Sequence, residues 1–132
     1  MSINAYKKTI RESESPRQIE RRIFSRIIGG LERDARRFDR SETRSDRLSI
    51  LSDGLRQTLT DNQAFWTALK FDLATPGNNL PAALRAQLLS ISLWVDRQTA
   101  VVLGGGTGVM ALLDVNRNIA AGLSGQAPGP RG

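Results

Sequence analysis

The stretch from Asn79 to Leu103 constrains the fold more than any other, because it has helical periodicity and apolar residues on two sides. At about 100° per residue, one set of apolar side chains points in a single direction, as in a helix packed on a core. This stripe contains Leu80, Leu84, Leu88, Ile91, Val95 and Val102. Leu89 and Leu93 form a second apolar patch well away from it. A small helical domain can cover both faces only by placing this helix centrally or by lending one face to a partner.

Apolar residues at three-to-four spacing predict further helices, and no segment shows the alternating pattern of a β-strand. The expected helices cover about residues 3–11, 16–40, 41 or 45 to 59, 62–73, 79–103 and 109–121. The sequence therefore predicts an all-α fold, a single-domain bundle of five or six helices over residues 1–123. A disordered tail is expected over residues 124–132, which are rich in glycine and proline.

Polar residues mark the expected helix starts. Ser15, with Pro16 and Gln18 behind it, has the spacing of a capping box. Asp61 is the expected cap of the 62–73 helix, and Asn79 that of the long helix, with Pro81 in its first turn.

Two glycine groups need a separate explanation. Gly29 and Gly30 lie inside a predicted helix, where each glycine costs about 1 kcal/mol relative to alanine, and close packing does not obviously account for them. The run Gly104–Gly108 lacks the Lys-Ser/Thr pair of a phosphate-binding loop and follows no strand. We therefore expect a flexible linker between two helices there.

The chain of 132 residues contains no histidine and no cysteine. It thus lacks the commonest general base, the commonest metal ligand and a thiol nucleophile. Asp114, Asn116 and Arg117 lie close together, but this grouping is typical of the polar face of a helix. We expect a protein that is not an enzyme, with no catalytic residues, no cofactor, no metal site and no small-molecule substrate.

Hydropathy bears on the cellular location. No stretch reaches the roughly 20 apolar residues of a membrane span. The first residues lack the apolar core of a secretory signal. The expectation is a cytoplasmic protein that does not bind membranes.

The net charge of +6 is unevenly distributed, because residues 1–47 hold 13 of the 19 Lys and Arg and 8 of the 13 Asp and Glu. Arginines of this region could follow a nucleic-acid backbone, since guanidinium groups pair well with phosphate. Interleaved aromatic residues for base stacking are missing, and acidic residues alternate with the basic ones. A solvated helix surface is the favoured interpretation, and contact with RNA or an acidic partner is the alternative.

The surplus of apolar residues suggests a partner-binding surface. Phe71, Leu89 and Leu93 depart from the main stripes of their helices, so they are the best candidates, with Trp94 or Trp66 at the margin. A groove of this kind would accept an amphipathic helix. The alternative is that all five residues are core, and it is the stronger one for the two tryptophans.

Five segments in collinear order resemble the FlaF family, flagellar biosynthesis regulators of alphaproteobacteria. They are NAYKKT from Asn4, ESPRQIERR from Glu14, NQAFWTALKFDL from Asn62, NNLPAALRAQLLSISLWVDRQT from Asn78 and LLDVNRNIAAGL from Leu112. The resemblance covers about residues 2–123, apart from the glycine linker.

This resemblance implies a non-enzymatic accessory factor of flagellum assembly. Such a factor binds flagellin, as an export chaperone does, and acts positively on flagellin synthesis and export, opposite the translational repressor FlbT. Direct binding to FlbT, or to the flagellin mRNA through the basic N-terminal half, are the alternatives. Flagellin termini are amphipathic and pair only in the filament, so an apolar surface on this chain could cover them before export.

Overall fold

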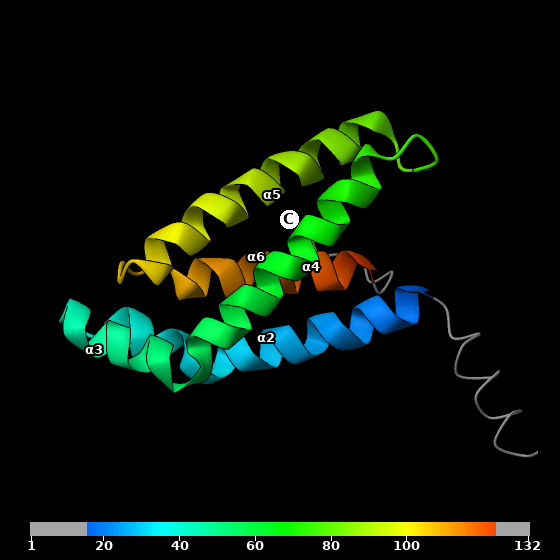
Figure 1. Ribbon diagram of the computed structural model, residues 1–132. Coiled ribbons are helices and arrows are strands. Elements are labelled where there is room, and N and C mark those ends of the chain that lie inside the picture. The colour runs from blue at the N-terminus through cyan, green and yellow to red at the C-terminus, as the bar shows by residue number, and fades with distance from the viewer. Residues whose placement is uncertain (1–15, 124–132) are drawn as a thin grey trace, which may run out of the picture.

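The computed structural model describes residues 16–123, which form helices and no strand (Figure 1). The elements are α2 (Pro16–Arg40), α3 (Arg44–Ile50), a π-helical segment η1 (Leu51–Leu55), α4 (Arg56–Ala74), α5 (Ala82–Leu103) and α6 (Val109–Leu123). The predicted all-α class is confirmed. The predicted count of five or six helices is not, because four helices are long and the short α3 continues through η1 into α4. The predicted helix over 3–11 and the predicted tail over 124–132 lie outside the described residues.

Helix α2 forms one side of the core. Its apolar residues recur every three or four positions and are buried, whereas most of its arginines lie on the opposite, exposed side. α2 packs most extensively on α6 and also contacts α4, and Figure 1 shows α6 running alongside it. The buried residues of α2 are Phe24, Ile27, Leu31, Ala35 and Phe38.

The boundary between the third and fourth predicted helices was wrong. The chain changes direction at Asp53 and Gly54, where Gly54 has a φ of 111°, and α4 then runs through Asp61 without a break. A positive φ of this size suits glycine, which has no Cβ. Thr43 begins α3 instead of Ser41 or Ser45, because its Oγ1 accepts a hydrogen bond from the Asp46 N–H at 3.1 Å.

The long helix begins later than predicted. Pro81 is the residue before the first turn of α5, so Leu80 lies outside the helix and Asn79 does not cap it. Asn78 instead stabilises the preceding turn, where its Oδ1 accepts a hydrogen bond from the Leu80 N–H at 3.0 Å. Pro81 is therefore a boundary residue because it lacks the N–H that a helix interior requires. α4 and α5 meet at this turn and diverge away from it (Figure 1).

Tertiary contacts account for one of the two mid-helix glycines. A Cβ on Gly30 would lie 2.8 Å from the Thr58 side chain, so the close approach of α2 and α4 requires glycine at this position. A Cβ on Gly29 would meet nothing within 4 Å in the described chain. The expectation that close packing explains neither glycine was wrong for Gly30.

These two glycines give a paired prediction. Gly29→Ala is expected to raise the free energy of unfolding by about 1 kcal/mol, because alanine is the better helix former and the space is open. Gly30→Ala is expected to lower it by about 1–3 kcal/mol, because the added methyl group forces α2 and α4 apart. Urea denaturation of both variants measures the difference. Equal effects of the two substitutions would contradict the close approach at Gly30.

The glycine loop between α5 and α6 is held in place, contrary to the flexible linker that was expected. The side chains of Arg44 and Arg47 donate hydrogen bonds to the carbonyls of Gly104 and Gly105, at 2.8 and 2.6 Å. Gly105 is buried and has a φ of 94°. The loop is therefore a fixed part of the fold, to which α3 contributes two arginines.

Asp39 of α2 completes this arrangement from the other side. Its Oδ1 accepts hydrogen bonds from the N–H groups of Gly108 and Val109, at 2.9 and 3.0 Å, and its Oδ2 accepts one from Met110 at 2.9 Å. Gly108 directly precedes α6, and the other two amides belong to its first turn, whose N–H groups have no partners within the helix. Asp39 is thus the N-terminal cap of α6, supplied by a distant part of the chain.

A buried polar network joins α4 to α6. The Trp66 Nε1–H donates to Asn116 Oδ1 at 3.0 Å, and Asn116 Nδ2 donates to Asn62 Oδ1 at 2.8 Å. All three side chains are fully buried. They fix the rotation of α4 relative to α6, because another rotation would leave polar groups without partners in the core.

Candidate partner-binding surface

Over the middle of α4 and the first half of α5, the surface formed by the exposed residues carries no charged side chain. We call this surface the uncharged face. It comprises exposed residues of α4 between 57 and 71 and of α5 between 82 and 93. They are Gln57, Thr60, Ala64, Thr67, Ala68, Phe71, Ala82, Ala83, Ala86, Gln87, Ser90 and Leu93. Leu84 is also exposed, but it precedes Leu93 by nine residues and so lies on the opposite side of α5; it is not part of this face. Since surfaces of soluble proteins usually carry many charges, this face is a candidate for contact with a partner.

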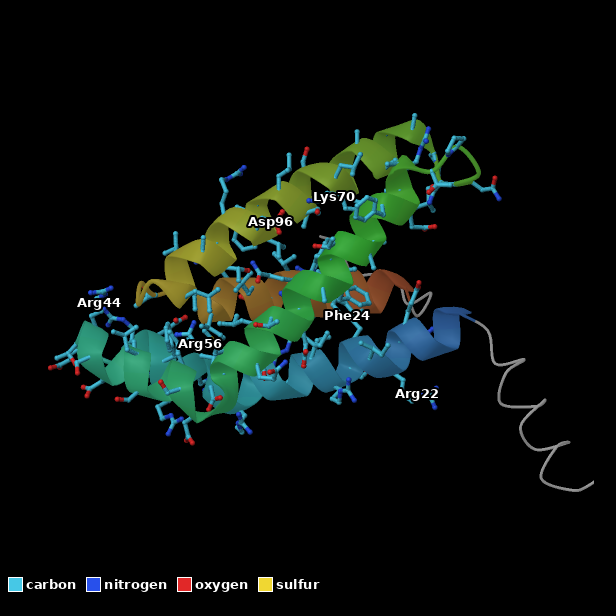
Figure 2. All side chains as sticks on the ribbon, in the orientation of Figure 1. Arg22, Phe24, Arg44, Arg56, Lys70 and Asp96 are labelled. Carbon is cyan, nitrogen blue, oxygen red and sulfur yellow. The ribbon has the colours of Figure 1, made fainter. Side chains whose placement is uncertain are left out.

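Phe71 and Leu93 are the most exposed large apolar residues of the uncharged face. Their exposed fractions are 72% and 51%. Both lie next to the ion pair that joins the two helices, in which Lys70 Nζ is 3.2 Å from Asp96 Oδ2. Figure 2 shows these two charged side chains between α4 and α5. Because these two charges pair with each other, a partner could contact the neighbouring apolar residues without meeting an unpaired charge from Lys70 or Asp96.

Helical spacing places Leu89 on the same side. Leu89 and Leu93 are four residues apart and precede Asp96 by seven and three, so all three share one side of α5. Because Asp96 on that side reaches Lys70 of α4, the two leucines lie toward α4. Leu89 is half-buried. The structure therefore brings Phe71, Leu89 and Leu93 to the α4–α5 side of the molecule, and their binding role stays a prediction.

The two tryptophans predicted at the margin of this surface differ in their burial. Trp66 is fully buried and hydrogen-bonded to Asn116, so its placement at the margin of a partner surface was wrong for this conformation. Trp94 is half-buried and packs against the core. An indole N–H that is buried needs a hydrogen-bond acceptor, and Asn116 supplies it for Trp66.

A second apolar feature, absent from the sequence predictions, is a groove of about 340 Å³ between α2 and α4. We call it the α2–α4 groove. It is lined by Glu20, Ile23, Arg26, Asp61, Ala64, Phe65, Ala68 and Leu69. Phe65 stacks on Phe24 with ring centroids 4.2 Å apart (Phe24 is labelled in Figure 2). The small residues Ala64 and Ala68 are the sequence feature that could have indicated this groove. The prediction would also have required knowing that α2, with Ile23, packs beside α4.

The basic side of the molecule is formed largely by α2, and two of its arginines pair with a carboxylate of the same helix. Arg33 and Arg37 both pair with buried Asp34, at 3.1 and 3.2 Å. Arg117 of α6 pairs with Glu32 at 2.9 Å. These contacts use guanidinium groups within the fold, which favours the interpretation of this side as a solvated helix surface.

Among residues 16–123 no group of three or more acidic side chains is arranged to hold a metal ion. No helix in this part of the chain is long and apolar enough to cross a membrane.

The fold and surface define an all-helical protein with a charged side on α2 and an uncharged side on α4 and α5. The model of the family described as flagellar protein FlaF matches residues 2–123. The chain therefore belongs to the FlaF family of flagellar proteins, as the resemblance predicted. No curated protein and no solved structure matches the chain.

Proposed function

We propose that this FlaF-family protein binds flagellin in the cytoplasm and covers one of its amphipathic segments before export. The observation that supports the proposal is the uncharged face, on which Phe71 and Leu93 are the most exposed large apolar residues. An amphipathic helix binds such a surface by laying its apolar side along it. Covering flagellin in this way would prevent premature assembly and link flagellin synthesis to export, without any catalytic step.

The interaction should depend on apolar burial more than on charge. Phe71 and Leu93 are exposed in the free protein, and full burial of such a side chain contributes about 1.5–3 kcal/mol. Two of the charges near them, Lys70 and Asp96, already pair with each other. Binding to the uncharged face should therefore change little with salt, whereas contact with phosphates weakens steeply as salt rises.

The first experiment is isothermal titration of the full chain with monomeric flagellin, at low and high salt. Tight one-to-one binding that tolerates salt is the expected result. Phe71→Ser combined with Leu93→Ser is expected to weaken it by at least about 30-fold, through the loss of buried apolar area. Val101→Ser is the matched control, because Val101 is also 51% exposed and lies on α5 beyond the uncharged face.

Two results would overturn the proposal. The absence of flagellin binding at either salt concentration would do so, and it would direct the same titration to FlbT. Binding that the double substitution leaves unchanged would show that another surface is used. A steep loss of affinity with salt would instead favour the basic side and an RNA partner, for which the flagellin mRNA is the probe.

A further inference from the structure

The α2–α4 groove is a largely apolar site that shares only Ala64 and Ala68 with the uncharged face. Five of its eight lining residues are small or apolar, and one of these, Ile23, is 38% exposed. Its volume of about 340 Å³ is at the lower end of the range for binding pockets, enough for a few side chains. The groove therefore fits a few apolar side chains of a peptide segment and not a large ligand.

The direction of the groove follows from contacts between its two helices. Phe24 stacks on Phe65, and Gly30, further along α2, lies against Thr58, which comes earlier in α4. The two helices therefore run antiparallel. The end of the groove formed by Glu20 and Leu69 thus lies toward the start of α2 at Pro16. The segment that precedes Pro16 would enter the groove at the Glu20–Leu69 end if it turned back along α2.

The residues before Pro16 have the features of a fitting occupant. Ile3, Tyr6 and Ile10 are spaced by three and four, so a helix places them on one side. At about 1.5 Å per residue, the stripe from Ile3 to Ile10 would be about 10 Å long. The groove residues of α4, from Asp61 to Leu69, span about 12 Å by the same rise. The two lengths agree.

Charge also favours this occupant. Two of the three charged residues that line the groove, Glu20 and Asp61, are acidic. The segment carries Lys7 and Lys8 next to its apolar stripe. Basic side chains flanking an apolar stripe complement acidic residues on the rim of an apolar groove.

We propose that the segment from Ile3 to Ile10 of this chain docks in the α2–α4 groove as a short amphipathic helix. The chain reverses between Glu12 and Pro16, so that Ile10 lies at the Ala68–Leu69 end of the groove and Ile3 at the Asp61 end. The docking is intramolecular and does not depend on flagellin.

Disulfide cross-linking tests this arrangement, and the native chain has no cysteine that would interfere. The test variant is Ile10→Cys with Ala68→Cys in the full chain. The control is Ile10→Cys with Thr67→Cys, because Thr67 is the chain neighbour of Ala68 but is exposed and does not line the groove. The test pair is expected to oxidise within one molecule at least about 10-fold faster than the control pair, because docking raises its effective concentration.

The outcomes separate the occupants of the groove. Fast oxidation that yields a monomer, at a rate independent of protein concentration, supports the proposal. Equal rates for the two pairs would overturn it. A covalent dimer, formed faster at higher concentration, would also overturn it and would make a second copy of the chain the occupant.

The docked segment has a consequence that rests on the proposed function. Ala64 and Ala68 belong both to the groove and to the uncharged face, so the segment would cover one edge of that face. The oxidised test variant is expected to bind flagellin several-fold more weakly than its reduced form. Equal affinities of the two forms would refute this competition, while the cross-linking rates would still decide the docking itself.

Discussion

Asn116→Ala is expected to lower the free energy of unfolding by about 3–5 kcal/mol. The change removes the acceptor of the Trp66 indole and the donor to Asn62, in a fully buried site. Each buried polar group left without a partner costs about 1–3 kcal/mol. The cavity left by the amide adds to this loss.

Chemical denaturation followed by the fluorescence of the two tryptophans measures the effect. Asn118→Ala is the matched control, because Asn118 lies on the same helix and is exposed, and surface changes of this kind are usually within about 0.5 kcal/mol. Adding Trp66→Phe to Asn116→Ala should cost less than Trp66→Phe alone, since the unsatisfied donor is removed. Fully additive effects would show that the hydrogen bond does not couple the two residues.

Asp39→Ala is expected to lower the free energy of unfolding by about 2–3 kcal/mol. The loss of an N-terminal cap costs about 0.5–2 kcal/mol, and a carboxylate next to the first turn of a helix adds a favourable charge interaction. Asp39 provides both, because it accepts hydrogen bonds from Gly108, Val109 and Met110.

Hydrogen exchange distinguishes this local role from a general one. In Asp39→Ala the amides of Val109 and Met110 should exchange faster than expected from the global loss of stability. Glu42→Ala is the control, because Glu42 is a nearby exposed carboxylate. Unchanged protection of these amides relative to the rest of α6 would contradict the cap.

The local features of the fold were largely predictable. The three-to-four spacing of Phe24, Ile27 and Leu31 predicted the buried side of α2, and it is buried. Phe71 and Leu93 depart from the main stripes of their helices, and both are exposed. These predictions hold because the period of a helix determines which residues share a face, whatever packs against it.

The errors arose where distant residues meet. Gly30 faces Thr58, and the glycine loop is fixed by Arg44 and Arg47, which precede it by about 60 positions. The break at Gly54 was missed because a single glycine within a helical pattern does not reveal its φ. For Trp66 a place at the margin of the partner surface and a place in the core were both considered, the core being favoured; the hydrogen-bond acceptor that holds it in the core is Asn116, 50 positions away.

The sequence by itself determined the all-helical class, the buried side of α2 and membership in the FlaF family, but it placed Asn116 on the polar side of its helix, where the structure buries it. Only the tertiary structure decided which apolar sides are covered: it buries Trp66, exposes Phe71 and opens a groove between α2 and α4. The physical reason is that periodicity acts within one helix, whereas burial depends on contacts between helices that the spacing of residues does not encode.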